Sequence, residues 1–313
     1  MHMELSILLF EKIVSMALIM MMGYAARKAH IAREEQIPLI SSLMMYVLIP
    51  CMVFRSFLMP FTTERFHAFL LAMAGGFASQ FLFILVAWAL GRSSFHADST
   101  EQACLAYTNC GNLLIPLINS LLGPEYVFYS VPFLAANTIF AWLHIPMLIS
   151  GQFRPEWRKI LLNPAILSVF AGILFFCLRI PLPGILSDTI ASVSSSIGVF
   201  SMLLTGMLMA GIDLRSVFMN VRYLIVSLMR LILFPLILIL IIRITGLSFR
   251  SDMFREVLMV VVMGGAAPTA TVVLVMSNLF GGKAELASAI SAMTTLMCIV
   301  TLPLMVLVYQ VVC

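Results

Sequence analysis

The chain has 313 residues, of which 62% are hydrophobic and only 10% are charged, and its mean hydropathy is +1.09. A soluble globular protein carries about 25% charged residues, so this chain cannot cover a water-facing surface. Its formal net charge of +4 is too small to indicate a nucleic-acid partner. Composition therefore excludes a soluble protein and predicts an integral membrane protein whose partner is the lipid bilayer.

Unbroken apolar runs of about twenty residues predict spanning helices rather than the alternating strands of an outer-membrane barrel. A bilayer core about 30 Å thick requires roughly 20 helical residues. In chain order, the predicted spans are 5–26, 37–58, 66–90, 101–122, 126–150, 164–180, 187–212, 221–247, 253–279 and 285–311. The predicted fold is an all-α integral membrane protein with about ten transmembrane helices and no folded soluble domain.

The basic residues of the connections predict the orientation, because Lys and Arg beside a span resist translocation. One side of the membrane receives Arg27, Lys28, Arg33, Arg92, Arg154, Arg158, Lys159, Arg215, Arg222 and Lys283. The other side receives Arg65, Arg179, Arg243, Arg250 and Arg255. We expect the richer side in the cytoplasm, which makes the chain a multi-pass protein of the cytoplasmic (inner) membrane with both termini non-cytoplasmic.

Ten helices divide into two sets of five, residues 1–150 and 164–313, joined by a cytoplasmic connection at 151–163. An odd number of spans per set places the halves in opposite orientations, which is typical of inverted repeats in secondary transporters. A weak internal match supports the division, because a polar pair and a proline recur at one spacing near the end of each half. These residues are Asn137, Thr138 and Pro146 in the first half and Thr294, Thr295 and Pro303 in the second.

The fourth and ninth predicted helices each carry glycine and proline near their midpoints, at residues 107–116 and 263–271. Proline removes a backbone donor and clashes with the preceding turn, and glycine weakens a helix by about 1 kcal/mol. We therefore predict two helix breaks at the same depth; one break alone would be read more simply as a packed proline kink. Broken backbone is tolerated in a membrane only where protein buries it or where it lines a wet cavity.

The substrate site is expected at these breaks and at the fifth helix. The candidate binding residues are Asn109, Cys110, Gly111, Asn112, Pro116, Asn137, Gly265, Ala266, Pro268 and Thr269. Residues 104–122 and 257–279 contain no Asp, Glu, Lys, Arg or His, so a bound cation would lack negative charge there. Half-helix N-termini and neutral hydrogen-bonding groups suit a carboxylate instead. We expect no metal and no cofactor.

Arg230 lies deep in the eighth predicted helix, where an arginine costs about 2.5 to 3.5 kcal/mol on insertion scales. It either pairs with carbonyls and helix ends or gives electrostatic support to the bound anion. Glu11, Asp213 and His144 are the candidates for binding a coupling ion. For each of them, capping, snorkelling or buried hydrogen bonding is the alternative.

These features resemble the auxin efflux carrier family, whose members include plant auxin exporters and bacterial permeases for small organic acids. The supporting stretches are Leu48–Pro50, Asn109 with Gly111 and Pro116, Asn163–Pro164, Ile180–Pro183, Arg230–Pro235 and the region from Pro268 to Leu304. The resemblance implies two inverted five-helix repeats whose fourth and ninth helices cross at prolines, matched here by Pro116 and Pro268. It also implies a scaffold, with the second and seventh helices, against which the crossed helices move. Leu114 and Asn112 depart from the family pattern.

The expected function is a secondary carrier that moves small organic carboxylate anions by alternating access, in the direction of efflux. An inside-negative potential of 100 mV contributes about 2.3 kcal/mol to the export of a monoanion, so uncoupled export suffices. The alternatives are an ion-coupled uptake permease for a dicarboxylate such as malate or malonate, or a carrier like the bile-acid symporters and antiporters of the same plan. A homodimer is left open. An enzyme is not expected, because no nucleophile–base motif or close Asp pair lies in a span.

Overall fold

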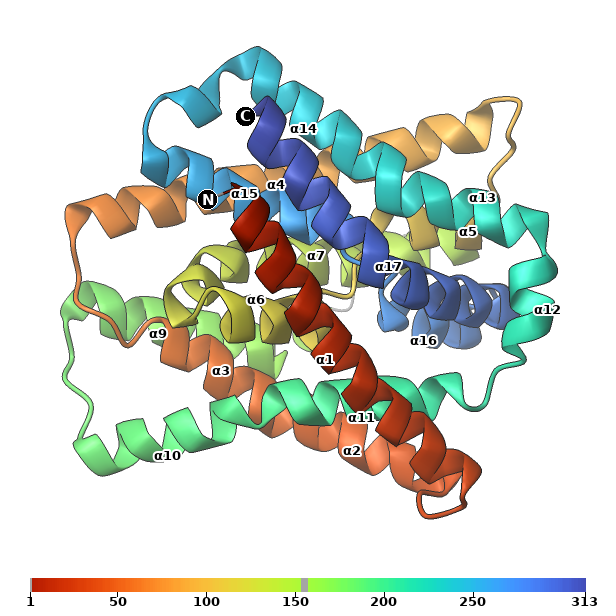
Figure 1. Ribbon diagram of the computed structural model, residues 1–313, viewed down its shortest axis with the longest axis horizontal. Helices are drawn as coiled ribbons and strands as arrows, with labels where there is room; N and C mark the ends of the chain where they lie inside the picture. Colours follow the sequence, from red (N-terminus) through yellow and green to blue (C-terminus); the bar gives the residue numbers. More distant parts are fainter. Residues whose placement is uncertain (1, 153–156) are drawn as a thin grey trace.

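The computed structural model describes residues 2–152 and 157–313, and within these residues the chain is helical without an extended strand (Figure 1). The first half contains α1 (His2–Lys28), η1 (Glu34–Gln36), α2 (Ile37–Leu43), η2 (Met44–Leu48), α3 (Ile49–Ser56), α4 (Thr63–Arg92), α5 (Ser99–Ala106), η3 (Cys110–Leu114), α6 (Ile115–Leu121) and α7 (Pro124–Ser150). Helix occupies each of the five spans predicted for this half.

The second half contains α8 (Trp157–Leu161), α9 (Pro164–Leu178), α10 (Gly184–Ser195), α11 (Ile197–Met209), α12 (Leu214–Met219), α13 (Val221–Leu228), η4 (Met229–Leu233), α14 (Phe234–Thr245), η5 (Leu247–Phe249), α15 (Asp252–Ala266), α16 (Thr271–Phe280) and α17 (Ala284–Val312). The predicted spans of this half are likewise helical. There are more helical elements than predicted spans because several spans consist of two or three consecutive helical segments.

Three of these divided spans share one cause, a proline at the second position of the following helix. The π-helical turns η2, η3 and η4 directly precede Pro50, Pro116 and Pro235. Because proline has no N–H and its ring clashes with the preceding turn, the regular helical bond is lost there. The residue before each proline instead donates to the carbonyl five residues earlier, which widens the turn without ending the helix.

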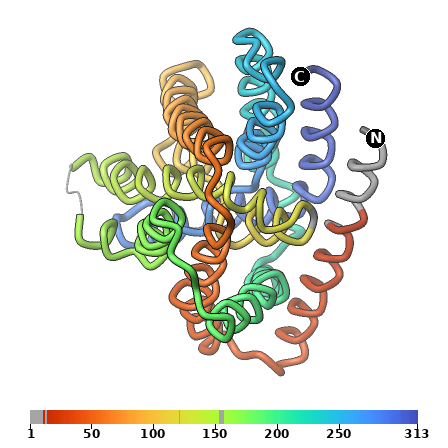
Figure 2. Tube along the Cα trace, turned by 90° about the vertical axis from the view of Figure 1, so that its left-hand side faces the viewer, coloured from red at the N-terminus to blue at the C-terminus, as the bar shows by residue number. Residues whose placement is uncertain are grey.

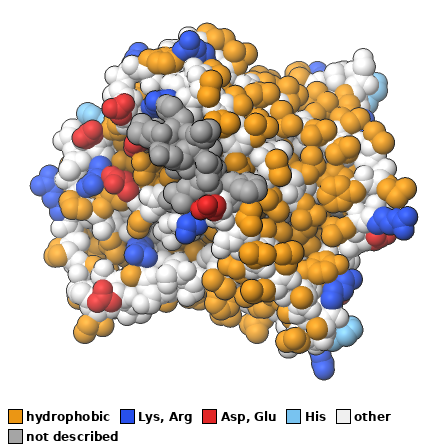
Figure 3. Space-filling view, in the orientation of Figure 1, with side chains coloured by type: hydrophobic (Ala, Val, Ile, Leu, Met, Phe, Trp, Pro, Cys, Tyr) orange, Lys and Arg blue, Asp and Glu red, His pale blue; other side chains and the backbone are white. Residues whose placement is uncertain are grey.

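Six helical stretches of the described residues are long and apolar enough to cross a membrane. They are Glu34–Ser56, Thr63–Arg92, Pro124–Ser150, Gly184–Met209, Val221–Thr245 and Ala284–Val312, and α9 and α16 are shorter apolar helices. Figure 3 shows apolar side chains over most of the middle and right of one face, with charged side chains mainly toward its margins. The protein is an all-helical, multi-pass membrane protein, whereas the ten-helix inverted repeat stays a prediction.

The helices gather in two groups with the broken helices between them. Both Figure 1 and Figure 2 show α2, α3, α10 and α11 together at the bottom and α4, α13 and α14 at the top. Between these groups lie α5, α6 and α16, while α15 lies beside α4 and α14 of the upper group. This arrangement places the two helix breaks in the interior of the molecule.

The lower group is held by very close helix packing. α1 lies against α11, and a Cβ atom on Gly206 or Gly23 would overlap backbone of the opposite helix, at Met20 and Leu203 respectively. Small residues allow helix backbones to approach this closely, which is the main source of helix association in lipid. These glycines therefore fix where α11, one wall of the molecule's interior, sits relative to α1.

Candidate functional site

The two helix breaks pair with each other through their backbones. α5 ends at Ala106 and α15 at Ala266, and the extended residues that follow form an antiparallel bridge between Thr108 and Thr269. The N–H of Asn109 donates to the carbonyl of Pro268 at 2.8 Å, and the N–H of Ala270 donates to the carbonyl of Tyr107 at 3.0 Å. The pairing satisfies backbone groups that lipid could not, so the broken segments form a stable crossing.

A side chain from a neighbouring helix holds each arm of this crossing. The amide of Asn137 in α7 accepts from the Thr108 N–H at 3.0 Å and donates to the Thr108 carbonyl at 3.1 Å. On the other arm, the Thr294 hydroxyl of α17 accepts from the Thr269 N–H at 3.2 Å. Asn137 and Thr294 are the matched residues of the internal sequence repeat. The two equivalent positions therefore have the same role, because each binds the backbone of one break.

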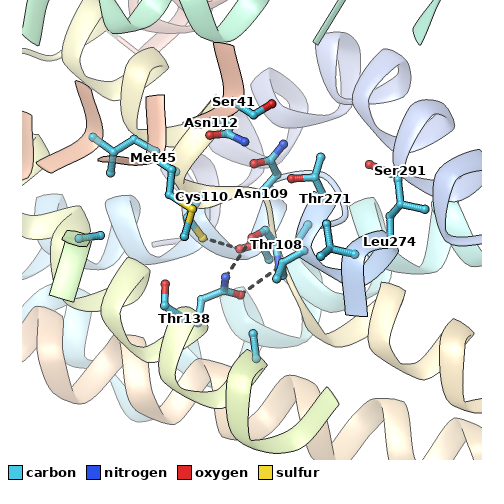
Figure 4. Close-up of a pocket in the computed structure, with 18 of the residues that line it drawn as sticks. Ser41, Met45, Thr108, Asn109, Cys110, Asn112, Thr138, Thr271, Leu274 and Ser291 are labelled. Carbon is cyan, nitrogen blue, oxygen red and sulfur yellow. Dashed lines mark hydrogen bonds between the residues drawn. The ribbon is translucent and has the colours of Figure 1, made fainter. Parts of the chain in front are cut away.

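A cavity of about 880 Å³ lies beside the crossing. Its walls come from α2, η2, α3, α7, α8, α9, α11, α16 and α17 together with residues of both breaks. Figure 4 shows Asn109, Asn112 and Thr271 on the same side of Thr108, near Ser41, with Thr138 and Ser291 on other walls. The cavity therefore offers neutral polar groups at the crossing and mainly apolar groups elsewhere.

Five of the residues predicted for binding line this cavity. They are Asn109, Cys110, Gly111, Asn112 and Asn137. Gly111 has room around it, whereas the Cys110 thiol contacts the Thr108 hydroxyl at 2.6 Å and is almost fully buried. Both amide atoms of Asn137 are engaged with Thr108, so its contribution is to position the crossing.

The other predicted residues lie outside the cavity lining. Pro268 and Thr269 form the second arm of the crossing, and Gly265 and Ala266 are buried at the end of α15. Pro116 follows Thr108 by eight residues and belongs to α6. The expectation that Pro116 marks the crossing is wrong, because the π-helical turn before it absorbs the missing hydrogen bond and the helix continues.

The charged groups of the cavity have one sign. Among the lining residues of the described chain, only Arg158 and Lys159 are charged, and both lie in α8, within the connection predicted to be cytoplasmic. The Lys159 ammonium lies 5.5 Å from the centre of the Trp142 ring. A concave, low-dielectric site lined by cations and neutral donors attracts anions.

Comparison with protein families identifies the chain. The family described as membrane transport protein matches residues 8–155 and 153–306, which together cover most of the sequence. The chain belongs to the auxin efflux carrier family. A comparison with curated proteins gave no match. As a member of this family the protein is a membrane transporter, and the family is one of transporters rather than enzymes.

Sequence reasoning did not find all of the polar groups that line this transporter's cavity. The residues missed as binding candidates are Ser41, Tyr46, Thr108, Thr138, Arg158, Lys159, Asn163, Thr205, Ser288, Ser291 and Thr295. Isolated Ser and Thr residues in apolar helices form no motif, and they usually bond to their own backbone. The internal repeat, which includes Thr138 and Thr295, and the stretch Asn163–Pro164 carried the only signals for any of them.

The three candidates for binding a coupling ion have different surroundings in the transporter. Asp213 is exposed and caps α12, where it accepts from the Arg215 N–H at 3.1 Å, as the capping alternative predicts. Glu11 is exposed on α1. His144 is the one beside the crossing, because its Nδ1 lies 2.9 Å from the hydroxyl of Tyr107.

Two ion pairs join the ends of the transporter's helices at the entrance to α5. The Arg222 guanidinium at the start of α13 contacts both carboxylate oxygens of the buried Glu101, at 2.6 and 2.7 Å. The Lys283 ammonium donates to Asp98 at 2.7 Å. This hydrogen bond raises the pKa of Lys283 above its ordinary value. α5, α13 and α17 are therefore held together at this end.

Proposed function

We propose that this transporter is a secondary carrier that exports small organic carboxylate anions by alternating access. The observation that carries the proposal is the cavity at the crossing, whose only charged lining groups among the described residues are cationic. A carboxylate entering this cavity meets Arg158 and Lys159 near α8 and neutral hydrogen-bonding groups at the crossing. Asn109, Asn112 and Thr271 are the side chains that we assign to its recognition.

The start of α16 adds backbone donors to this site. Ala270, Thr271 and Val272 line the cavity, and no side chain of the described residues caps the N-terminus of the helix. The first N–H groups of a helix lack intrahelical partners and carry the positive end of its dipole. A carboxylate placed there gains donors without displacing a cap, which favours an anion over a cation.

Alternating access requires two bodies that move past one another, and the packing supports such a division. The cavity separates the crossing from α2 and α11, which belong to the lower group of helices. The paired contacts support an inverted repeat of residues 1–150 and 164–313, because α1 packs on α11 and, correspondingly, α3 on α9. We infer that the lower group is the scaffold and that the crossing moves with the upper group.

The direction of transport follows from the predicted orientation. With α8 and its basic residues in the cytoplasm, the cavity faces the cell interior and both termini lie outside the inner membrane. The inside-negative potential then drives a bound monoanion outward, at about 2.3 kcal/mol per 100 mV. No coupling ion is needed for export, although the His144–Tyr107 pair beside the crossing is the place where a proton would bind in a coupled mechanism.

Flux measurements in proteoliposomes test this proposal. Labelled malate, malonate, lactate and indole acetate are offered to the purified protein under imposed potentials and pH gradients of either sign. We expect counterflow of at least one carboxylate and net movement toward the positive side without a pH gradient. Flux that requires an inward proton gradient would favour coupled uptake, and absence of any carboxylate flux under all conditions would refute the carrier assignment.

A further inference from the structure

Arg230 is the largest fully buried side chain of the described protein, and it has no polar partner. Its exposed fraction is 0%, and none of its three guanidinium nitrogens forms a hydrogen bond with any part of the chain that the structure describes. A buried polar group without a partner is rare, and a buried unpaired charge is rarer still. A capping or carbonyl-pairing role, the alternative considered from sequence, would leave hydrogen bonds that are not found.

The surroundings of Arg230 belong to the crossing and the helices around it. The guanidinium carbon lies 5.3 Å from the ring centre of Phe83 and 5.7 Å from that of Phe234, so aromatic faces stabilise the cation. Its turn, η4, packs against α5, α15 and α17. The carboxyl ends of α5 and α15 carry the negative ends of two helix dipoles, which favour a cation nearby. Arg230 is therefore built into the same body as the crossing.

Arg230 also lies close behind the cavity wall. Its turn, η4, packs against α17, and α17 lines the cavity through Ser291, Ala292 and Thr295. The guanidinium is charged under all physiological conditions. No carboxylate among the described residues pairs with it, and the nearby helix α5 has its one buried carboxylate, Glu101, engaged with Arg222. Arg230 is consequently a buried positive charge of the crossing body that no described carboxylate compensates.

We propose that Arg230 is the counter-charge of the transported anion. This proposal rests on the function proposed above. It means that the positive charge of Arg230 and the negative charge of a bound monocarboxylate cancel when the loaded carrier changes its orientation. The empty carrier then returns with the positive charge of Arg230. The charge moved per complete cycle is still that of the anion, so Arg230 decides which step feels the membrane potential and leaves the overall driving force unchanged.

Exchange and net efflux separate these steps. Exchange of labelled for unlabelled lactate uses only the loaded carrier, so the wild-type exchange rate is expected to be independent of an imposed potential. Net efflux needs the empty return and should be accelerated by an inside-negative potential. In wild-type protein, exchange of malonate, a dianion, should respond to the potential because its loaded carrier keeps one negative charge.

The variant Arg230→Met removes the counter-charge. Its lactate exchange should become dependent on potential, since 100 mV acting on one charge changes the equilibrium between the two orientations by about fiftyfold. Arg230→Lys keeps the charge at the same depth and should keep lactate exchange independent of potential. Membrane insertion and thermal stability of both variants are measured alongside, because the methionine also fills the buried site.

Two results would overturn the assignment of Arg230. The first is a lactate exchange rate of the wild type that depends on the imposed potential. The second is a lactate exchange rate of Arg230→Met that does not depend on it. If Arg230→Met does not fold, the wild-type comparison of lactate with malonate decides alone, and equal responses of the two substrates would refute the counter-charge. Absence of flux for every carboxylate would instead refute the proposed function, so the two failures are distinguishable.

Discussion

The contact between α1 and α11 and the crossing of the two broken helices solve the same problem by opposite means. At α1, glycines remove side chains so that two regular helices touch through their backbones. At the crossing, the helices themselves are interrupted, and the freed backbone groups bond to each other, to Asn137 and to Thr294. The first contact depends on shape and the second on hydrogen bonds.

This difference indicates which region can serve transport. The closely packed contact between α1 and α11 has no space for added atoms or for a ligand. It is therefore suited to a rigid scaffold. Interrupted helices expose donors and acceptors at mid-membrane, and such groups are retained only where protein or a cavity satisfies them. The comparison predicts that substitutions that add side-chain volume will unfold the contact between α1 and α11. Substitutions that remove polar groups will weaken the crossing or transport through it.

The largest expected effect is that of Gly206→Leu. The new Cβ would overlap the Met20 carbonyl, and backbone of α1 cannot yield as a side chain can. We expect a loss of more than about 3 kcal/mol or failure to insert as a monodisperse protein. Thermal unfolding in detergent and size-exclusion profiles measure it.

The matched control for this variant is Gly198→Leu in the same helix. A Cβ there meets no atom within 4 Å, so little change in unfolding temperature is expected. Similar losses in both variants would show that α11 needs glycine for a reason other than its contact with α1.

Asn137→Ala is expected to have the next largest effect. It leaves the buried N–H of Thr108 without its partner, at about 1 to 3 kcal/mol, and removes one of the two donors to the Thr108 carbonyl, which still accepts from the Cys110 N–H. Thr294→Val should cost somewhat less, because Thr294 holds only the N–H of Thr269. Unfolding temperatures of the two variants test the order, and an equal or reversed order would contradict the hydrogen-bond roles assigned to Asn137 and Thr294.

Asn109→Ala should leave the fold almost unchanged and stop transport. The crossing uses the backbone N–H of Asn109, which alanine retains, while no hydrogen bond of its side chain is found in the described structure. We expect carboxylate flux to fall by at least tenfold with an unfolding temperature near that of the wild type. Asn119→Ala in α6, away from the cavity, serves as the control; unimpaired flux in Asn109→Ala would remove this side chain from the site.

The sequence was sufficient to predict the helical spans and the break at Pro268, because hydropathy and span length act locally. It placed the first break within 107–116 but assigned the crossing to Pro116, which only widens its turn, because the actual break at Thr108 depends on pairing with a segment about 160 residues away. Arg158 and Lys159 were predicted only as topology signals. Their presence in the cavity depends on how α8 folds back, which no local pattern encodes.

The smallest expected effect tests the ion pair at the entrance to α5. Lys283→Met removes the contact with Asp98, but the lysine is largely exposed, so water and salt screen the pair and less than about 1 kcal/mol should be lost. Since the hydrogen bond raises the pKa of Lys283, its contribution is complete below the ordinary value of 10.5 and disappears as the pH rises beyond the raised value. Unfolding temperatures of wild type and Lys283→Met should therefore differ slightly at pH 8 and converge at strongly alkaline pH. A gap that widens with pH would show that Lys283 stabilises the protein by some means other than its charge.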